Sequence, residues 1–325
     1  MGMLMFCAAA EVVAQDPQFS QFYAAPLFLN PALTGSTAQG RVALNYRNQW
    51  PAIPGAFVSY NASFDYYLSD INSGVGVILT HDKAGSGALT YTNFGGSYSY
   101  EFKVSKNVVI KPGIQFSLYK RGVDLNKLTF SDQLARGSGR STVEYVNSNF
   151  TTKFDFASGL MVYGRNFWAG FAGHHLNGLN ESLLGQTAAL PPKYSLHGGG
   201  RYVIKQGRYG RVQRAIWGAF NLKQQSEFRQ LDLGVYMEFY PIVIGTWYRG
   251  LPVGNQPGSY HKNTDAITVL LGTKIETLQI GYSYDLTLSR LIGNTGGSHE
   301  ISVVYEFVDP RPKKHKMRIV PCPQF

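Results

Sequence analysis

Alternation of apolar and polar residues, over segments of about nine to eleven residues, is the feature that most restricts what this 325-residue chain can fold into. From Val58 to Leu68, apolar or aromatic residues fill every second position. The same period of two recurs at 108–118, 231–239 and 278–286. Because successive side chains of a strand point to opposite faces, each segment predicts a β-strand with one apolar and one polar face.

A soluble β-sandwich would show the same period, so other features must separate it from a membrane barrel. Many of the segments are long enough for a tilted strand to cross the hydrocarbon, and only 15% of residues are charged, against about 25% in ordinary soluble proteins. Small and charged residues share the polar face, as a lumen permits. Aromatic residues gather near the predicted strand ends, as interfacial girdles do: Tyr46, Trp50, Tyr66, Tyr67, Trp168, Tyr240, Trp247, Tyr248 and Phe307.

The predicted fold is therefore all-β, an outer-membrane antiparallel β-barrel of about 14 strands with an irregular N-terminal arm and a short C-terminal periplasmic tail. No stretch reaches the roughly 18 to 20 consecutive apolar residues of a membrane-spanning helix. An even strand number places both ends of the barrel sequence on the periplasmic side. The predicted strands are 41–50, 57–68, 73–82, 87–101, 106–121, 152–164, 166–175, 193–204, 211–221, 228–239, 241–249, 264–273, 276–287 and 298–307.

Connection lengths support this orientation, because periplasmic turns are short and external loops are long. Short links fall at 69–72, 104–105, 164–165, near Pro241 and at 274–275. Long links fall at 122–151, 176–192 and 250–263. The link 205–210 is the exception, since it is of moderate length on the short side.

The domain organisation follows from the ends of the chain. Residues 1–14 predict a signal peptide, because an apolar run precedes small residues and cleavage fits between Ala14 and Gln15. A basic n-region is missing, so we expect that the true start lies upstream or was wrongly assigned, and lipidation at Cys7 fits the flanking residues poorly. We expect an N-terminal periplasmic arm or plug at 15–40, a transmembrane barrel at 41–307 and a basic periplasmic tail at 308–325. With Cys7 removed, Cys322 has no partner for a structural disulfide.

No catalytic motif occurs in the sequence, so we predict no enzyme and no cofactor. The HExxH, GxSxG and GxxxxGK[ST] patterns are all missing. His174 and His175 would face opposite sides of a strand and so could not share a metal. We interpret His81 and Asp82 as a polar loop boundary, and the glycines at 198–200 as a bend in a strand.

Charge and burial patterns predict a barrel with a partly filled lumen. The net charge is +10, but the basic residues are scattered, which favours contact with outer-membrane lipid headgroups over nucleic acid.

The residues expected to face the lumen carry charges of both signs, which favours an internal salt-bridge network; a solvated pore wall is the alternative. These residues are Arg47, Asp65, Lys111, Asp232, Glu238, Asp285 and Glu306. The aromatic arm is expected to plug the lumen or to pack beneath it.

The end of the chain departs from a simple barrel. The last predicted strand finishes on Phe307, the type of aromatic strand end that barrel-assembly machinery recognises, but 308–325 follow it. This segment is basic, and it predicts either a disordered tail or a periplasmic docking peptide.

Three motifs stand out along the chain. The first is the arm, Asp16-Pro17-Gln18-Phe19-Ser20-Gln21-Phe22-Tyr23 with Asn30-Pro31-Ala32 and Gly35; the second is the first hairpin, with Arg47, Gln49, Trp50 and Gly55; and the third is the ending Cys322-Pro323-Gln324-Phe325. Together these motifs resemble the PorP/SprF membrane proteins of the type IX secretion system. The resemblance covers the whole chain.

The resemblance implies a role in protein secretion and surface attachment, often in gliding motility. Such a barrel would hold the C-terminal domain of a surface adhesin with its external loops, or would link the outer membrane to periplasmic type IX secretion subunits through its tail and arm. The alternative from a different class is an outer-membrane diffusion porin for small solutes.

Overall fold

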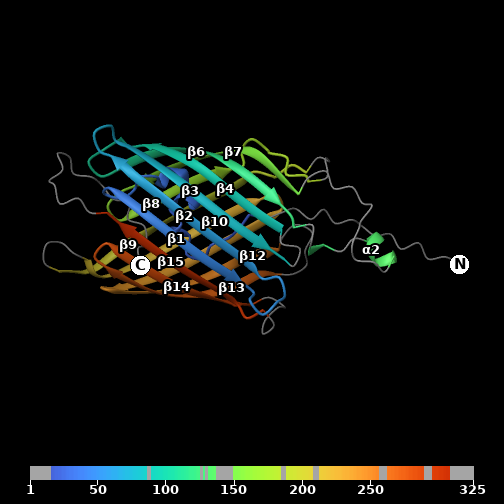
Figure 1. Cartoon of the computed structure of the whole chain (residues 1–325). Coiled ribbons are helices and arrows are strands. Elements are labelled where there is room, and N and C mark those ends of the chain that lie inside the picture. The colour runs from blue at the N-terminus through green and yellow to red at the C-terminus, as the bar shows by residue number, and fades with distance from the viewer. Residues whose placement is uncertain are drawn as a thin grey trace.

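The computed structural model describes residues 16–85, 89–124, 127–128, 131–136, 149–183, 188–207, 212–255, 262–288 and 295–307. Within these ranges, fourteen antiparallel strands close into a barrel, and one two-residue strand lies outside the ring (Figure 1). Each of the fourteen barrel strands pairs with the barrel strands before and after it, so β4 pairs with β6, and β1 closes the ring by pairing with β15 from Arg41↔Glu306 to Gln49↔Ser298. The predicted fold class is confirmed.

The strands are close to the predicted ones, and several are longer. They are β1 (Gly40–Gln49), β2 (Phe57–Leu68), β3 (Ser73–Ala84), β4 (Leu89–Tyr100), β5 (Phe102–Lys103), β6 (Val109–Gly122), β7 (Phe150–Tyr163), β8 (Phe167–His174), β9 (Lys193–Gln206), β10 (Val212–Gln225), β11 (Phe228–Phe239), β12 (Ile242–Asn255), β13 (Lys262–Ile275), β14 (Leu278–Thr287) and β15 (Ser298–Glu306). The extra length of β10, β12 and β13 lies mainly at the end with the long loops.

The outward face of the wall is apolar, as a lipid-facing surface requires. Leu44, Phe64, Phe94 and Val235 are all exposed on it. Their sequence neighbours point inward, because strand side chains alternate in direction. The chain is thus an outer-membrane barrel whose apolar surface lies on the outside and whose polar surface lines the lumen.

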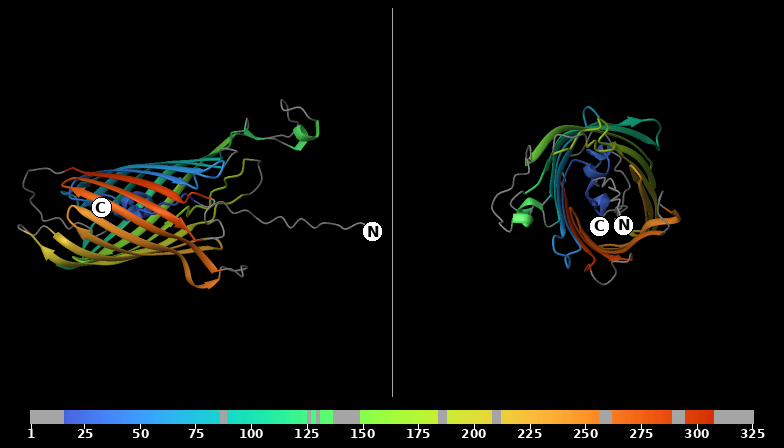
Figure 2. Two further views of the ribbon diagram at one scale, coloured as in Figure 1. Left: turned by 90° about the horizontal axis from the view of Figure 1, so that it is seen from below. Right: turned by 90° about the vertical axis from the view of Figure 1, so that its right-hand side faces the viewer.

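The two ends of the barrel differ in their connections. Gly40 and Glu306 lie at the end where β7 and β8 are joined across 164–166 and β13 and β14 across 276–277, which is the periplasmic end for a barrel of this kind. The opposite, external end carries the link from β6 to β7, which contains the helix α2 (Ser131–Arg136) (Figure 2, left). One external connection is short, since β10 and β11 are joined by Ser226 and Glu227 alone. The link 205–210 lies partly outside the described residues.

The N-terminal arm fills the inside of the barrel, where Figure 2 (right) shows it as the blue segment within the ring. It contains three short helical turns, η1 (Phe22–Ala24), α1 (Pro26–Leu29) and η2 (Pro31–Leu33). Proline opens both α1 and η2, where its fixed φ suits the first helical position. Among the described residues no helix is long and apolar enough to cross a membrane.

Candidate functional site

The arm runs the whole length of the lumen from the external mouth to the periplasmic end. Asp16 lies at the external end, where it contacts His175 and Lys193 beside the link from β8 to β9. Gly40 lies at the periplasmic end, where β1 begins. Almost every residue between them is buried. The described part of the arm therefore occupies the path that a solute would take.

Glycines on the inner wall provide the space in which the arm lies. A Cβ at Gly113 would meet the backbone N of Ala32 at 2.4 Å, and a Cβ at Gly74 would meet the carbonyl of Thr34 at 2.2 Å. A Cβ at Gly159 would lie 2.0 Å from Oδ1 of Asn30. These strands therefore need glycine for a close approach of the arm.

Asn30 ties the arm to the wall with its side chain. Its Oδ1 accepts a hydrogen bond from the backbone N of Ala32 at 2.8 Å and so caps η2. Its Nδ2 donates to the carbonyl of Phe171 at 3.2 Å and lies 3.1 Å from Nε2 of His197. One buried amide thus satisfies groups on both the arm and the wall.

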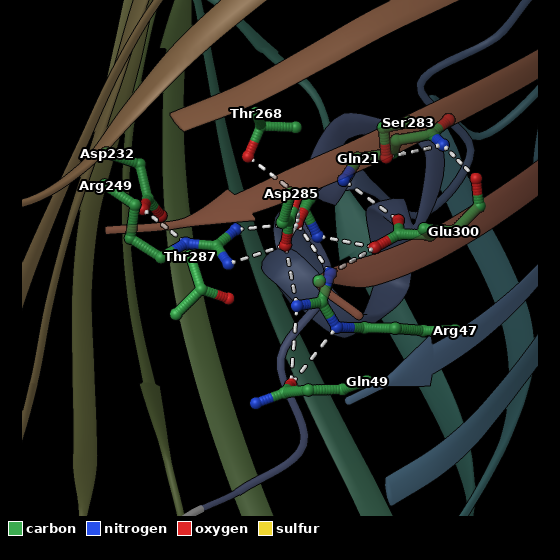
Figure 3. Close-up of polar contacts among 12 residues, drawn as sticks. Gln21, Arg47, Gln49, Asp232, Arg249, Thr268, Ser283, Asp285, Thr287 and Glu300 are labelled. Atoms are coloured by element: carbon green, nitrogen blue, oxygen red, sulfur yellow. Dashed lines mark hydrogen bonds and ion pairs between the residues drawn. The ribbon is translucent and has the colours of Figure 1, made fainter. Parts of the chain in front are cut away.

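A buried charge network holds the external half of the arm (Figure 3). Asp285 lies at its centre, with Arg47 at 2.7 Å and Arg249 at 3.1 Å. Both guanidinium groups also donate to the hydroxyl of Ser20 on the arm, at 2.6 and 2.8 Å. Arg249 also forms an ion pair with Asp232 at 3.2 Å. A salt-bridge network is therefore present in the lumen, with Arg47, Asp232 and Asp285 of the predicted residues in it, and the arm is part of it.

Glu300 extends this network to the backbone of the arm. Its two carboxylate oxygens accept from the backbone N of Ser20 at 2.7 Å and of Gln21 at 2.9 Å. Arg47 neutralises the same carboxylate at 3.1 Å. Buried charges are tolerated when they are paired and fully hydrogen-bonded, and an incomplete network would cost stability.

A second charge cluster holds the periplasmic half of the arm. Asp65 accepts from Arg41 at 2.9 Å and from the backbone N of Gly35 at 2.7 Å. Lys111 is fully buried and donates to the carbonyl of Gly35 at 2.8 Å. Gly35 has a φ of 60°, a conformation that side-chain-bearing residues rarely adopt.

Aromatic side chains of the arm pack against tryptophans on β8 and β12. The ring of Phe22 packs at 4.8 Å from that of Trp247, and Nε1 of Trp168 donates to the hydroxyl of Tyr23 at 3.1 Å. Gly199 makes room for the Trp168 ring. Of the glycines at 198–200, predicted to bend the strand, Gly199 leaves space for this ring against β9.

At the external end, Asp16 is bound by two cationic groups. Nε2 of His175 lies 2.9 Å from its carboxylate, and Nζ of Lys193 donates to the same oxygen. Burial alone would raise the pKa of Asp16, but His175 and Lys193 outweigh it and hold that pKa well below the ordinary value. Burial likewise opposes the charge on His175, yet Asp16 and Asp155 raise its pKa to about 9.

The reasoning that His174 and His175 face opposite sides is wrong in the structure. His175 follows the end of β8 with a φ of 57°, so the alternation of the strand stops there and both rings are buried, with centroids 6.5 Å apart. The two ring nitrogens of His175 face the carboxylates of Asp16 and Asp155, at 2.9 and 3.0 Å. In the described part of the chain, no group of three or more His, Cys, Asp or Glu residues is placed to hold a metal.

A cavity of about 570 Å³ lies above the start of the arm at the external mouth. Asp16, Pro17 and Gln18 form part of its lining. The rest of the lining comes from the external ends of strands around the barrel: Gln49, Trp50, Phe57, Ser59, Asp82, Ala84, Leu89, Tyr91, Arg121, Phe228, Gln230, Gly250 and Asp265.

Most of the residues singled out in the sequence meet in the lumen. The arm motif packs against the wall, Arg47 joins the charge network, and Gln49 and Trp50 line the external cavity. His81 bonds Thr92, whereas Asp82 lines the cavity. The cleavage pair Ala14 and Gln15 and the ending with Cys322, Pro323 and Phe325 lie outside the described residues.

Two important residues were missed by the sequence reasoning although the alternation could have identified them. Glu300 precedes the outward-facing Ile301, so its side chain must point inward. Arg249 lies two residues after the inward-facing Trp247 on the same strand. Nothing in the sequence around Glu300 or Arg249 identifies the arm residue that each one contacts.

Three solved barrels are similar to the chain in fold. Omp33 of Acinetobacter baumannii has a TM-score of 0.43 at 9% identity, with 84% of this chain and 100% of that chain covered. The toluene transporters TbuX of Ralstonia pickettii and TodX of P. putida have TM-scores of 0.48 and 0.45 at 11% and 10% identity, each with 86% of this chain and 92% of that chain covered. A search of curated proteins found no match.

The sequence itself matches a family model over nearly its full length. The match covers residues 12–305 and belongs to the type IX secretion system membrane protein PorP/SprF. It includes the arm, the first hairpin and all strands of the barrel. The chain is therefore a member of the PorP/SprF family of type IX secretion system membrane proteins.

Proposed function

We propose that this barrel works by binding and not by catalysis or diffusion, and that it retains a large surface adhesin at its external end by that protein's C-terminal domain. The observation that carries the proposal is the filled lumen. The arm occupies it from Asp16 to Gly40 and is fixed by two charge clusters. A barrel closed in this way is a rigid support for loops, which are the usual carriers of recognition.

The external end offers the surface for such a partner. The link from β6 to β7, with its helix α2, and the strands β12 and β13 project there, around the mouth cavity. A protein that is exported and then held at the cell surface meets this end first.

On the periplasmic side, we propose that the tail at 308–325 contacts subunits of the secretion machinery. The described part of the arm is buried in the lumen and offers little surface to a periplasmic protein. The tail carries Arg311, Lys313, Lys314, Lys316 and Arg318, which suit an acidic docking surface.

Affinity purification from native outer membranes tests both halves. The tag belongs in the external link between β14 and β15, which leaves both the tail and the link from β6 to β7 free. Recovery of one very large surface protein supports the adhesin anchor, and recovery of periplasmic subunits that is lost on truncation after Phe307 supports the role of the tail. If neither is recovered and the protein gives steady ion conductance in bilayers, the diffusion porin replaces the proposal.

A further inference from the structure

The external mouth cavity carries hydrogen-bond acceptors that the barrel itself leaves unused. Asp265 and Asp82 both line it. Among the described residues, Asp265 has no ion pair or side-chain hydrogen bond, and Asp82 accepts one hydrogen bond, from the hydroxyl of Ser59. In contrast, the carboxylates deeper in the lumen are paired with arginines.

A third acceptor in the cavity lining is buried and unpartnered. Gln230 is 1% exposed, and its Nε2 donates to Asp232 at 2.8 Å. Its Oε1 has no hydrogen-bond partner within the described structure. A buried acceptor left without a donor costs about 1–3 kcal/mol, so such a group at a cavity wall points to a missing donor.

The local backbone turns one of these carboxylates toward the mouth. Arg249 pairs with Ala266 and Gly250 pairs with Thr264, so Asp265 is skipped in the register of β12 and β13. Bulges of this kind re-aim a side chain and recur next to functional sites. Without the bulge, alternation would point Asp265 outward beside Ile267.

Aromatic rings complete the lining. Trp50, Phe57, Tyr91 and Phe228 all contribute to it, and the rings of Trp50 and Phe57 lie 5.6 Å apart. Aromatic faces attract cations through their quadrupole.

Two other charged residues of the lining already have partners in the barrel. Arg121 lies 3.9 Å from Glu181, and the carboxylate of Asp16 is paired with Lys193 and His175.

From this arrangement we infer that the mouth cavity binds a lysine or arginine side chain presented by a segment of the retained partner protein. The inference rests on the proposed function and names the chemistry of its contact. Ammonium and guanidinium groups are pure donors and match the acceptors of Asp82, Asp265 and Gln230. An anionic group would face two carboxylates, and a volume of about 570 Å³ lies within the roughly 300–1,000 Å³ of ligand pockets.

The test uses the full mature protein in detergent and two labelled peptides. One is Gly-Ser-Gly-Arg-Gly-Ser-Gly, and the other has citrulline, which has the shape of arginine without the charge. We expect the arginine peptide to bind about tenfold or more tightly by fluorescence anisotropy, the lower end of what a hydrogen bond to a charged group contributes. Equal binding of the two peptides would overturn the inference.

Variants locate the contact. Asp265→Asn and Asp82→Asn should each reduce the preference for arginine, and the double variant should abolish it. Asp70→Asn is the matched control, because Asp70 is exposed in the turn between β2 and β3 at the other end of the barrel. If the double variant keeps the same preference for arginine, the cavity does not bind this side chain. If spermidine binds tightly and neither peptide binds, the cavity takes a small polyamine and not a protein side chain.

The outcome separates this inference from the proposed function. If native purification yields a surface protein that the double variant retains equally well, the adhesin anchor stands and the cavity contact fails. If the arginine preference is present but no surface protein is recovered, the cavity chemistry stands and the proposed partner fails.

Discussion

Replacing Gly113 with alanine should release the arm from the wall. The new Cβ would lie 2.4 Å from the backbone N of Ala32 and 2.5 Å from both the Cα of Ala32 and the carbonyl carbon of Pro31. Carbon contacts are optimal at about 3.5–4.0 Å, so η2 must move by about 1 Å. The contacted atoms are backbone and cannot rotate away.

The energetic cost follows from overpacking. Extra methyl groups in a packed interior cost about 1–3 kcal/mol, which corresponds to a roughly 5- to 150-fold shift between a seated and a displaced arm. The movement also strains the Asn30 cap, whose Oδ1 accepts from the backbone N of Ala32. We therefore expect the fraction of time that single channels are open to rise by a factor in this range.

Planar-bilayer recordings measure this change, with Gly218→Ala as the matched control. Gly218 lies on the outward face of β10, and a Cβ there would meet nothing within 4 Å. Heat-modifiable gel mobility confirms that each variant still forms a barrel. If Gly113→Ala and Gly218→Ala conduct alike, the arm is not held by this close approach and the reasoning is refuted.

Three further perturbations address the groups that hold the arm. Asp285→Asn removes the charge shared by two buried arginines and should cost about 3–5 kcal/mol of the stability of the folded barrel, measured as a lower midpoint of unfolding in denaturant. The pKa of His175 is raised to about 9, so its contribution to stability is full below its ordinary pKa of about 6.5 and is lost as the pH rises through 9. The thermal unfolding midpoint should therefore fall between pH 7 and pH 10, and it should fall less in His175→Gln. A midpoint that stays constant, or that falls equally in the variant, would contradict this. Lys111→Met keeps the length of the side chain but removes the donor to Gly35. It should lower the free energy of unfolding by about 1–3 kcal/mol in denaturant titrations, whereas Lys106→Met, at an exposed lysine, should change nothing.

The strands could be predicted from the sequence because alternation is a local property. The inward residues Asp65, Lys111 and Asp285 followed from the same alternation, and so did the apolar outer face. Helix α2 within the link from β6 to β7 was not predicted, since six residues are too short to show a helical period.

The partners of the lumenal residues depended on tertiary structure alone. Ser20 and Glu300 are separated by 280 residues, and nothing in either segment identifies the other. The left-handed conformation of His175 and the bulge at Asp265 broke the alternation at strand ends, where connections and not the pleat set the direction of a side chain.

The sequence by itself therefore determined a membrane barrel, its strand order and which side chains face inward, because each strand carries its two faces in its own residues. Only the tertiary structure decided that the arm lies inside the lumen, with Asp16 at the external mouth and Gly40 at the periplasmic end. The arm has no period, and its position depends on glycines and charges contributed by strands from all around the ring.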